Sequence, residues 1–124
     1  MAETEHSQEN LAYIRTHVDN IERMTWFQLA SSPTRITYVT EEFQSKKHSA
    51  NVYLALANGP KSQDQLMKST RMSRANISKI LTHLEGLHFI DSIRNPDARK
   101  QLLFKWTEAE KILKLSKIAQ SIVK

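Results

Sequence analysis

The sequence contains no cysteine, and only two of its 124 residues are glycine. Without cysteine the chain can form no disulfide, no thiolate metal site and no cysteine nucleophile, which fits a reducing compartment. Two glycines are too few for a glycine-rich phosphate-binding loop. No apolar run is long enough to span a bilayer, and the polar N-terminus lacks the pattern of a signal peptide. We therefore expect a soluble, cytoplasmic, single-domain protein without membrane contacts.

Acidic residues are scarce in one part of the chain, and the basic excess gathers there. Residues 1–60 carry five Lys and Arg against seven Asp and Glu, whereas residues 61–105 carry nine against four. The second segment thus has a net charge of +5, and residues 106–124 add a further +2. A localised basic excess is the electrostatic footprint of nucleic-acid binding, but it also fits a solvated face on an ordinary basic protein. Charge alone leaves both interpretations open.

Residues 62–87 have the pattern of two short helices joined by a tight turn. Ser62 is a natural cap for the first helix, and Gln65 is placed to complete a capping box with it. Ser73 is a natural cap for the second helix. The second helix has one apolar stripe at helical spacing, made of Ile77, Ile80, Leu81 and Leu84. Its opposite face has one strong cation, Lys79, among small polar groups and no central acid, so it can approach a polyanion closely.

The chain after this motif has the pattern of a β-hairpin. An extended segment begins at His88-Phe89-Ile90, and Asn95-Pro96-Asp97 has strong turn chemistry. Residues 101–107 then alternate in the manner of a strand, around Leu102, Phe104 and Trp106. The tip and flanks of the predicted hairpin carry three cations, Arg94, Arg99 and Lys100.

A long amphipathic helix is predicted at the N-terminus, over residues 8–30. Its apolar stripe has the spacing of a coiled-coil seam and consists of Leu11, Ile14, Val18 and Ile21. We expect this stripe to pair with a second copy of the chain. Packing against the chain's own core is the alternative, above all for Met24, Trp26 and Phe27.

Further helices are predicted on either side of the helix pair. Ser32-Pro33 should start a helix to about residue 44, with apolar spacing at Ile36, Val39 and Phe43. Residues 50–57 predict a short buried helix that ends at Gly59. Thr107 and Glu110 form a second predicted capping box, which starts a final helix over residues 108–124. The apolar side of this last helix is expected to join a dimer interface through Leu115, Ile118 and Ile122.

The order of helix, helix-turn-helix, hairpin and helix is that of a winged helix. Residues 73–85, the pair Phe89-Ile90 and the hairpin at residues 95–100 resemble winged helix-turn-helix transcription regulators of the MarR and ArsR type. The resemblance covers residues 50–107. In one departure, His88 stands where the family usually has glycine, and we expect a positive φ there.

The resemblance implies a mainly α fold with a small β-hairpin. It is a winged helix-turn-helix in which residues 50–107 form the core of a single domain spanning residues 1–124. Residues 8–30 and 108–124 are then long N- and C-terminal dimerisation helices.

The resemblance also implies a sequence-specific regulator of transcription that binds double-stranded DNA. A homodimer would read a pseudo-palindromic operator, with the helix from Ser73 in the major groove and the hairpin, or wing, at the minor groove. Candidate DNA contacts are Ser62, Lys68 and Arg71, the second-helix residues Ser73, Arg74, Asn76, Ser78, Lys79, Thr82 and His83, and the hairpin residues Arg94, Arg99 and Lys100. For each one, a solvated surface side chain is the alternative. The competing function is a winged-helix protein-interaction module without specific DNA binding.

Other chemistries find little support in the sequence. None of the five histidines forms a close metal-ligand pair with another histidine or a carboxylate, and no nucleophile sits beside a recognisable base. We expect no enzyme activity, no metal and no cofactor, and the sequence identifies no small-molecule or ion effector. RNA binding lacks the exposed aromatic pairs of sheet-type RNA readers.

Overall fold

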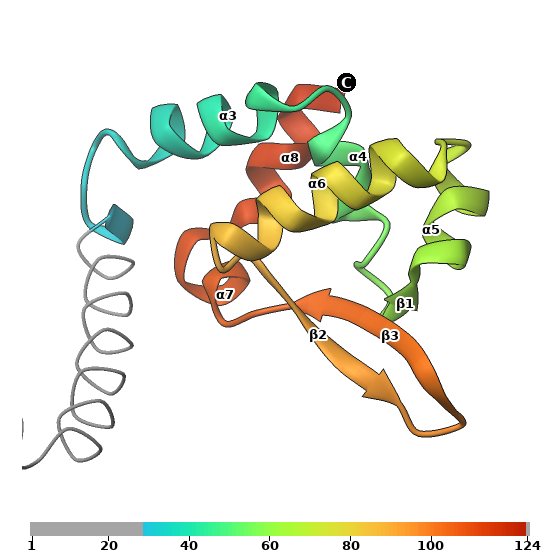
Figure 1. Ribbon diagram of the computed structural model, residues 1–124. Coiled ribbons are helices and arrows are strands. Elements are labelled where there is room, and N and C mark those ends of the chain that lie inside the picture. The colour runs from blue at the N-terminus through green and yellow to red at the C-terminus, as the bar shows by residue number, and fades with distance from the viewer. Residues whose placement is uncertain (1–28, 124) are drawn as a thin grey trace, which may run out of the picture.

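The computed structural model describes residues 29–123, and every element below belongs to this range. In chain order the elements are α3 (Arg35–Ser45), α4 (Ser49–Leu54), β1 (Lys61–Ser62), α5 (Gln63–Thr70), α6 (Arg74–Gly86), β2 (Ile90–Asn95), β3 (Ala98–Trp106), α7 (Ala109–Leu113) and α8 (Leu115–Val123). Figure 1 shows α6 crossing the front of the helical layer, while the β2–β3 hairpin extends away from it. This mainly helical arrangement with a small antiparallel sheet confirms the predicted fold class.

The predicted N-terminal helix at residues 8–30 lies outside the described residues, apart from its last two positions. The same holds for its proposed dimer stripe, Leu11, Ile14, Val18 and Ile21.

Apolar side chains of the helices form one core that reaches the base of the sheet. The Phe43 ring of α3 packs against two other aromatic rings, with centroids 5.3 Å from Tyr53 and 5.8 Å from Phe89. The predicted stripe of α6 is buried as expected, with Ile77, Ile80, Leu81 and Leu84 each at most 3% exposed. On α3, Val39 and Phe43 are buried, but Ile36 is 58% exposed and takes no part in the core.

The caps predicted for the helix-turn-helix are present. Ser62 Oγ accepts a hydrogen bond from Gln65 N at 3.2 Å, and Gln65 Oε1 accepts one from Ser62 N at 2.8 Å, which completes the capping box of α5. Ser73 Oγ accepts from Asn76 N at 3.2 Å and so caps α6. Between them, α5 ends at Arg71 with a left-handed φ of 59°. At the far end of α6, His88 has φ 61°, which confirms the expected positive φ.

The sheet has three antiparallel strands in the order β1-β3-β2. The hairpin was predicted, but β1 was not, because two residues carry no periodic pattern of their own. In β1, Lys61 pairs with Phe104 and Ser62 with Leu103. Since Ser62 is also the N-cap of α5, the same residue joins the hairpin to the helix-turn-helix.

The predicted final helix over residues 108–124 is wrong in two respects. Lys114 adopts φ 55°, which divides the segment into α7 and α8. In addition, α8 packs against α3 and α4 of its own chain, so Leu115 is fully buried and Ile118 is 8% exposed. These two residues belong to the core and are not available to a dimer surface, while Ile122 is half-buried.

The predicted capping box of Thr107 and Glu110 is also absent. Thr107 Oγ1 accepts from Ala109 N at 3.2 Å and donates to the His88 carbonyl at 2.6 Å. Glu110 instead accepts hydrogen bonds from the Tyr53 hydroxyl and from Ser116 N, both at 2.8 Å, and from the Ser116 hydroxyl. The local spacing predicted that the Glu110 carboxylate caps the helix, but this carboxylate binds Tyr53 and Ser116 instead.

Tyr53 connects this carboxylate to the base of the hairpin. Its side chain is fully buried and stacks on Trp106, with ring centroids 5.0 Å apart and planes 14° apart. Trp106 Nε1 donates to the Tyr53 carbonyl at 2.8 Å. Burial and the neighbouring Glu110 raise the pKa of Tyr53 far above its ordinary value, so its hydroxyl remains a donor.

Removing that hydroxyl should destabilise the protein. Tyr53→Phe leaves the half-buried Glu110 without one donor, and we expect the free energy of unfolding to fall by about 1–3 kcal/mol. Urea denaturation followed by circular dichroism measures this change. The matched control is Tyr38→Phe on α3, where the residue is 39% exposed and the loss should stay within about 0.5 kcal/mol. Equal midpoints for the two variants would contradict the prediction.

Candidate nucleic-acid interface

Burial of the apolar stripe of α6 leaves the opposite side of this helix in solvent. We call this side the α6 face; its exposed residues are Arg74, Ala75, Asn76, Ser78, Lys79 and Thr82. No acidic residue lies in the first turn of α6. The Thr82 hydroxyl donates to the Ser78 carbonyl at 2.9 Å, so it is bound to its own helix. The remaining side chains are short or cationic, and the helix can come close to another molecule.

His83, predicted to flank this face, lies elsewhere. It is partly buried, and its Nε2 atom lies 2.9 Å from Ser45 Oγ and 3.1 Å from the Glu42 carbonyl oxygen. The Glu42 carboxylate is 3.6 Å from the same nitrogen. His83 therefore connects α6 to the end of α3 and is not part of the α6 face.

The residues predicted around α5 differ in accessibility. Ser62 is 3% exposed and its hydroxyl is engaged in the cap, so the structure does not leave it open to a phosphate. Lys68, in the last turn of α5, and Arg71, which ends the helix, are both exposed. Two cations thus stand near the turn that leads into α6.

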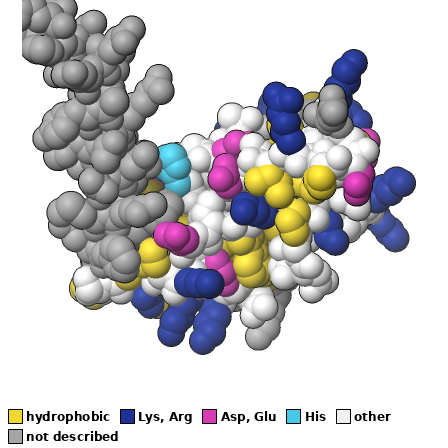
Figure 2. Space-filling view, turned by 90° about the horizontal axis from the view of Figure 1, so that it is seen from below, with side chains coloured by type: hydrophobic (Ala, Val, Ile, Leu, Met, Phe, Trp, Pro, Cys, Tyr) yellow, Lys and Arg dark blue, Asp and Glu magenta, His cyan; other side chains and the backbone are white. Residues whose placement is uncertain are grey.

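The tip of the hairpin is shaped by Asn95. Its Oδ1 accepts from Asp97 N at 3.0 Å, and its Nδ2 donates to Gln101 Oε1 at 2.6 Å. Arg94 and Lys100 are exposed on the two strands, whereas the side chain of Arg99 lies outside what the structure describes. In the view of Figure 2, Lys and Arg side chains project from the edges of the molecule and apolar side chains are exposed between them.

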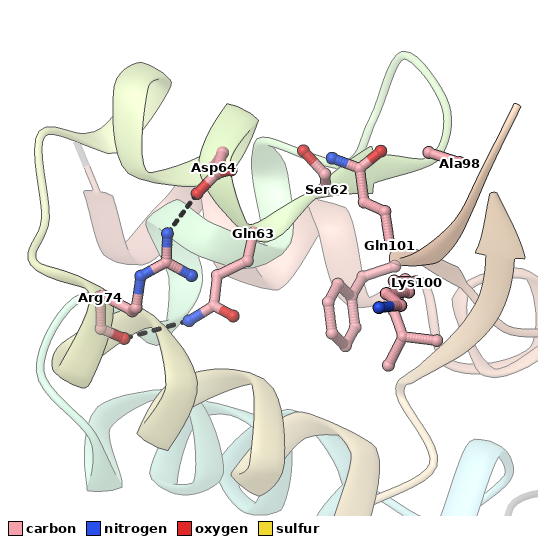
Figure 3. Close-up of a pocket in the computed structure, with 9 residues that line it drawn as sticks. Ser62, Gln63, Asp64, Arg74, Ala98, Lys100 and Gln101 are labelled. Carbon is pink, nitrogen blue, oxygen red and sulfur yellow. Dashed lines mark hydrogen bonds and ion pairs between the residues drawn. The ribbon is translucent and has the colours of Figure 1, made fainter.

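A hollow of about 640 Å³ separates the helix-turn-helix from the hairpin. Figure 3 shows Gln63 and Asp64 of α5 and Arg74 of α6 on one side of it, with Lys100 of β3 on the other. Leu102, 47% exposed, adds an apolar surface from β3. The start of the α6 face and the hairpin therefore border the same depression.

Arg74 is held from α5. Its Nη2 atom lies 2.5 Å from Asp64 Oδ1, and Gln63 Nε2 donates to the Arg74 carbonyl at 3.2 Å (Figure 3). Gln63 and Asp64 were not among the predicted site residues, because their contacts with Arg74 depend on the angle between two helices. The one available signal is an acid in the first turn of one helix and a cation in the first turn of the next.

The two ends of α6 differ in charge. Partial burial and the nearby charge of Asp91 raise the pKa of Glu85, near the C-terminal end of the helix. The cations Arg74 and Lys79 lie in its first half, where the helix dipole also favours an anion. Arg74 is paired with Asp64, so Lys79 and the helix dipole would attract an anionic partner to this half.

The described residues contain no metal-ligand cluster and no membrane-spanning helix. Among residues 29–123, no three His, Asp or Glu side chains gather into a group that could hold a metal ion. The helices within the same range are too short or too polar to cross a membrane.

Solved structures share this fold, although no family model and no curated protein matches the sequence. A mutant of ZitR from Lactococcus lactis is 21% identical with a TM-score of 0.52, over 62% of this chain and 49% of that protein. The chain thus spans about half the length of ZitR. A probable transcriptional regulator from Pseudomonas aeruginosa is 22% identical with a TM-score of 0.55, over 70% of this chain and 72% of that one.

A mutant of MarR from E. coli, in complex with operator DNA, is 11% identical with a TM-score of 0.56, over 92% of this chain and 76% of that one. At these identities the comparison establishes the winged-helix fold. The structural neighbours include MarR-type proteins, and the ArsR part of the predicted resemblance has no support among these three.

The cap of α6 allows a direct test of how this helix is held. Ser73→Ala removes the acceptor for Asn76 N, and we expect a loss of about 1 kcal/mol in the free energy of unfolding. Ser78→Ala on the exposed face is the matched control and should change it by less than about 0.5 kcal/mol. Thermal unfolding of both variants measures these changes. Equal free energies of unfolding for the two variants would show that the Ser73 cap does not stabilise the protein.

Proposed function

We propose that this protein binds double-stranded DNA sequence-specifically and regulates transcription. The observation that carries the proposal is the α6 face, cationic and free of acids in its first turn, which borders the same hollow as the hairpin. The major groove of B-DNA admits an α-helix, and the neighbouring minor groove then lies beside the wing. The chain would bind with α6 in the major groove and the hairpin at the minor groove.

The residues suit distinct parts of this task. Asn76 can form a bidentate pair with adenine, and Lys79 can reach guanine or a phosphate. On the hairpin, Arg94 and Lys100 can enter the minor groove or hold its backbone. Lys68 and Arg71 are the phosphate candidates beside the turn. Contacts to phosphates fix the position of the protein, whereas contacts to base edges choose the sequence.

The structural neighbours support the same function by analogy of fold. The MarR mutant with a TM-score of 0.56 was solved in complex with operator DNA. Since one fold can serve several functions, this analogy adds to the argument from the α6 face and does not replace it. The competing function, a protein-interaction module, would use the same basic face to dock on an acidic partner.

Salt dependence separates the two functions. Counterion release makes the affinity of a DNA binder for duplex fall steeply as salt rises. Lys79→Ala should weaken binding to all duplexes about five- to tenfold and should reduce the salt slope by about one. Lys117→Ala, an exposed lysine of α8, is the matched control and should change neither quantity. If duplex affinity is insensitive both to salt and to Lys79→Ala, the interaction module is favoured.

A homodimer on a pseudo-palindromic operator is the second part of the proposal. Two copies would place their α6 helices about one helical turn apart, which is about 34 Å. The support is the coiled-coil spacing of Leu11, Ile14, Val18 and Ile21, since two of the predicted C-terminal contacts are buried in the core.

Ile14→Asp combined with Val18→Asp should convert a dimer into a monomer, because charged residues at the seam oppose pairing. Sedimentation equilibrium measures the mass, and duplex binding should weaken at the same protein concentration. The control is Gln120→Asp, which adds one charge on the exposed side of α8. A wild-type chain that sediments as a monomer at micromolar concentration would refute the dimer.

A further inference from the structure

Asp64 is an acid placed at the start of a surface otherwise suited to DNA. It lies in the first turn of α5, borders the hollow between helices and hairpin, and is paired with Arg74 at 2.5 Å. Both side chains are more than 60% exposed, so the pair is open to solvent and to any molecule docked on α6. A second hydrogen bond joins the same two helices, because the side-chain amide of Gln63 donates to the backbone carbonyl of Arg74.

The pair leaves most of the guanidinium free. Asp64 accepts from Nη2, and a guanidinium carries five N–H donors in a rigid plane. Guanine presents two neutral acceptors, O6 and N7, to such a plane. A phosphate at the same position would meet the carboxylate as well as the arginine, and like charges repel at this range. Asp64 therefore disfavours a backbone contact by Arg74 and leaves a base contact available.

From this geometry we infer that Asp64 is a specificity-determining positioning residue, which holds Arg74 for reading a guanine edge and opposes its use as a phosphate clamp. The inference rests on the proposed function, DNA binding by α6. By its charge alone, Asp64 would only weaken DNA binding. In this proposal, it also increases the difference in affinity between cognate and unrelated DNA.

The test uses the full chain and two duplexes. One is the sequence selected by the wild-type protein from a random pool, and the other is a scrambled duplex of the same length and base composition. Asp64→Asn should bind the scrambled duplex more tightly, because a negative charge is lost and Arg74 is released. Its preference for the selected duplex should fall at least about fivefold, the lower range for losing one bidentate base contact.

Two further variants separate positioning from charge. Asp91→Asn removes one negative charge from β2, near Glu85 at the other end of α6, and should leave the preference unchanged. Asp64→Glu keeps the charge within reach of Arg74 and should retain most of the preference. Thermal unfolding should show that all three variants fold, since the Asp64–Arg74 pair and Asp91 are exposed.

The outcomes are distinct. A preference that falls with Asp64→Asn but survives Asp91→Asn and Asp64→Glu supports the inference. Equal behaviour of Asp64→Asn and Asp91→Asn, or an unchanged preference in Asp64→Asn, overturns it while DNA binding stands. A wild-type chain that selects no duplex overturns the proposed function and this inference together.

Discussion

Burial of one apolar stripe fixes how α6 is rotated about its own axis. Ile77 and Leu84 are fully buried, and Ile80 and Leu81 nearly so. Fully burying such a side chain contributes about 1.5–3 kcal/mol, more than the polar residues of an exposed helix face usually do. The side chains opposite the stripe must then face solvent, whatever their identity. The α6 face can therefore carry residues suited to binding without loss of the fold.

Local patterns predicted most of the fold correctly, because the decisive contacts lie close together in sequence. The caps at Ser62 and Ser73 are formed by residues three positions apart. The turn at Asn95 depends on its own side chain and on the amide two residues later. In such segments, propensity and tertiary structure agree.

The predictions failed where a contact with a residue far away in the sequence determines the structure. Glu110 fits a capping box by spacing, yet the buried hydroxyl of Tyr53, far away in sequence, binds its carboxylate. The left-handed turn at Lys114 could not be predicted, because position 114 holds neither glycine nor asparagine. This turn directs Leu115 into the core. In the candidate site, His83 is drawn to α3 and Asp64 reaches Arg74 across the turn. No periodicity within one helix encodes these contacts.

Ser62 belongs to two parts of the molecule at once, since it pairs with Leu103 of β3 and caps α5. Backbone hydrogen bonds between β1 and β3 consequently hold the hairpin at a fixed distance from the helices. In the proposed complex, the protein would fit only a double helix whose adjacent grooves lie at the matching distance. DNA sequences differ in groove width and in the cost of bending. Under this proposal, base pairs between the two contacted grooves would influence the choice of target through the shape of the DNA.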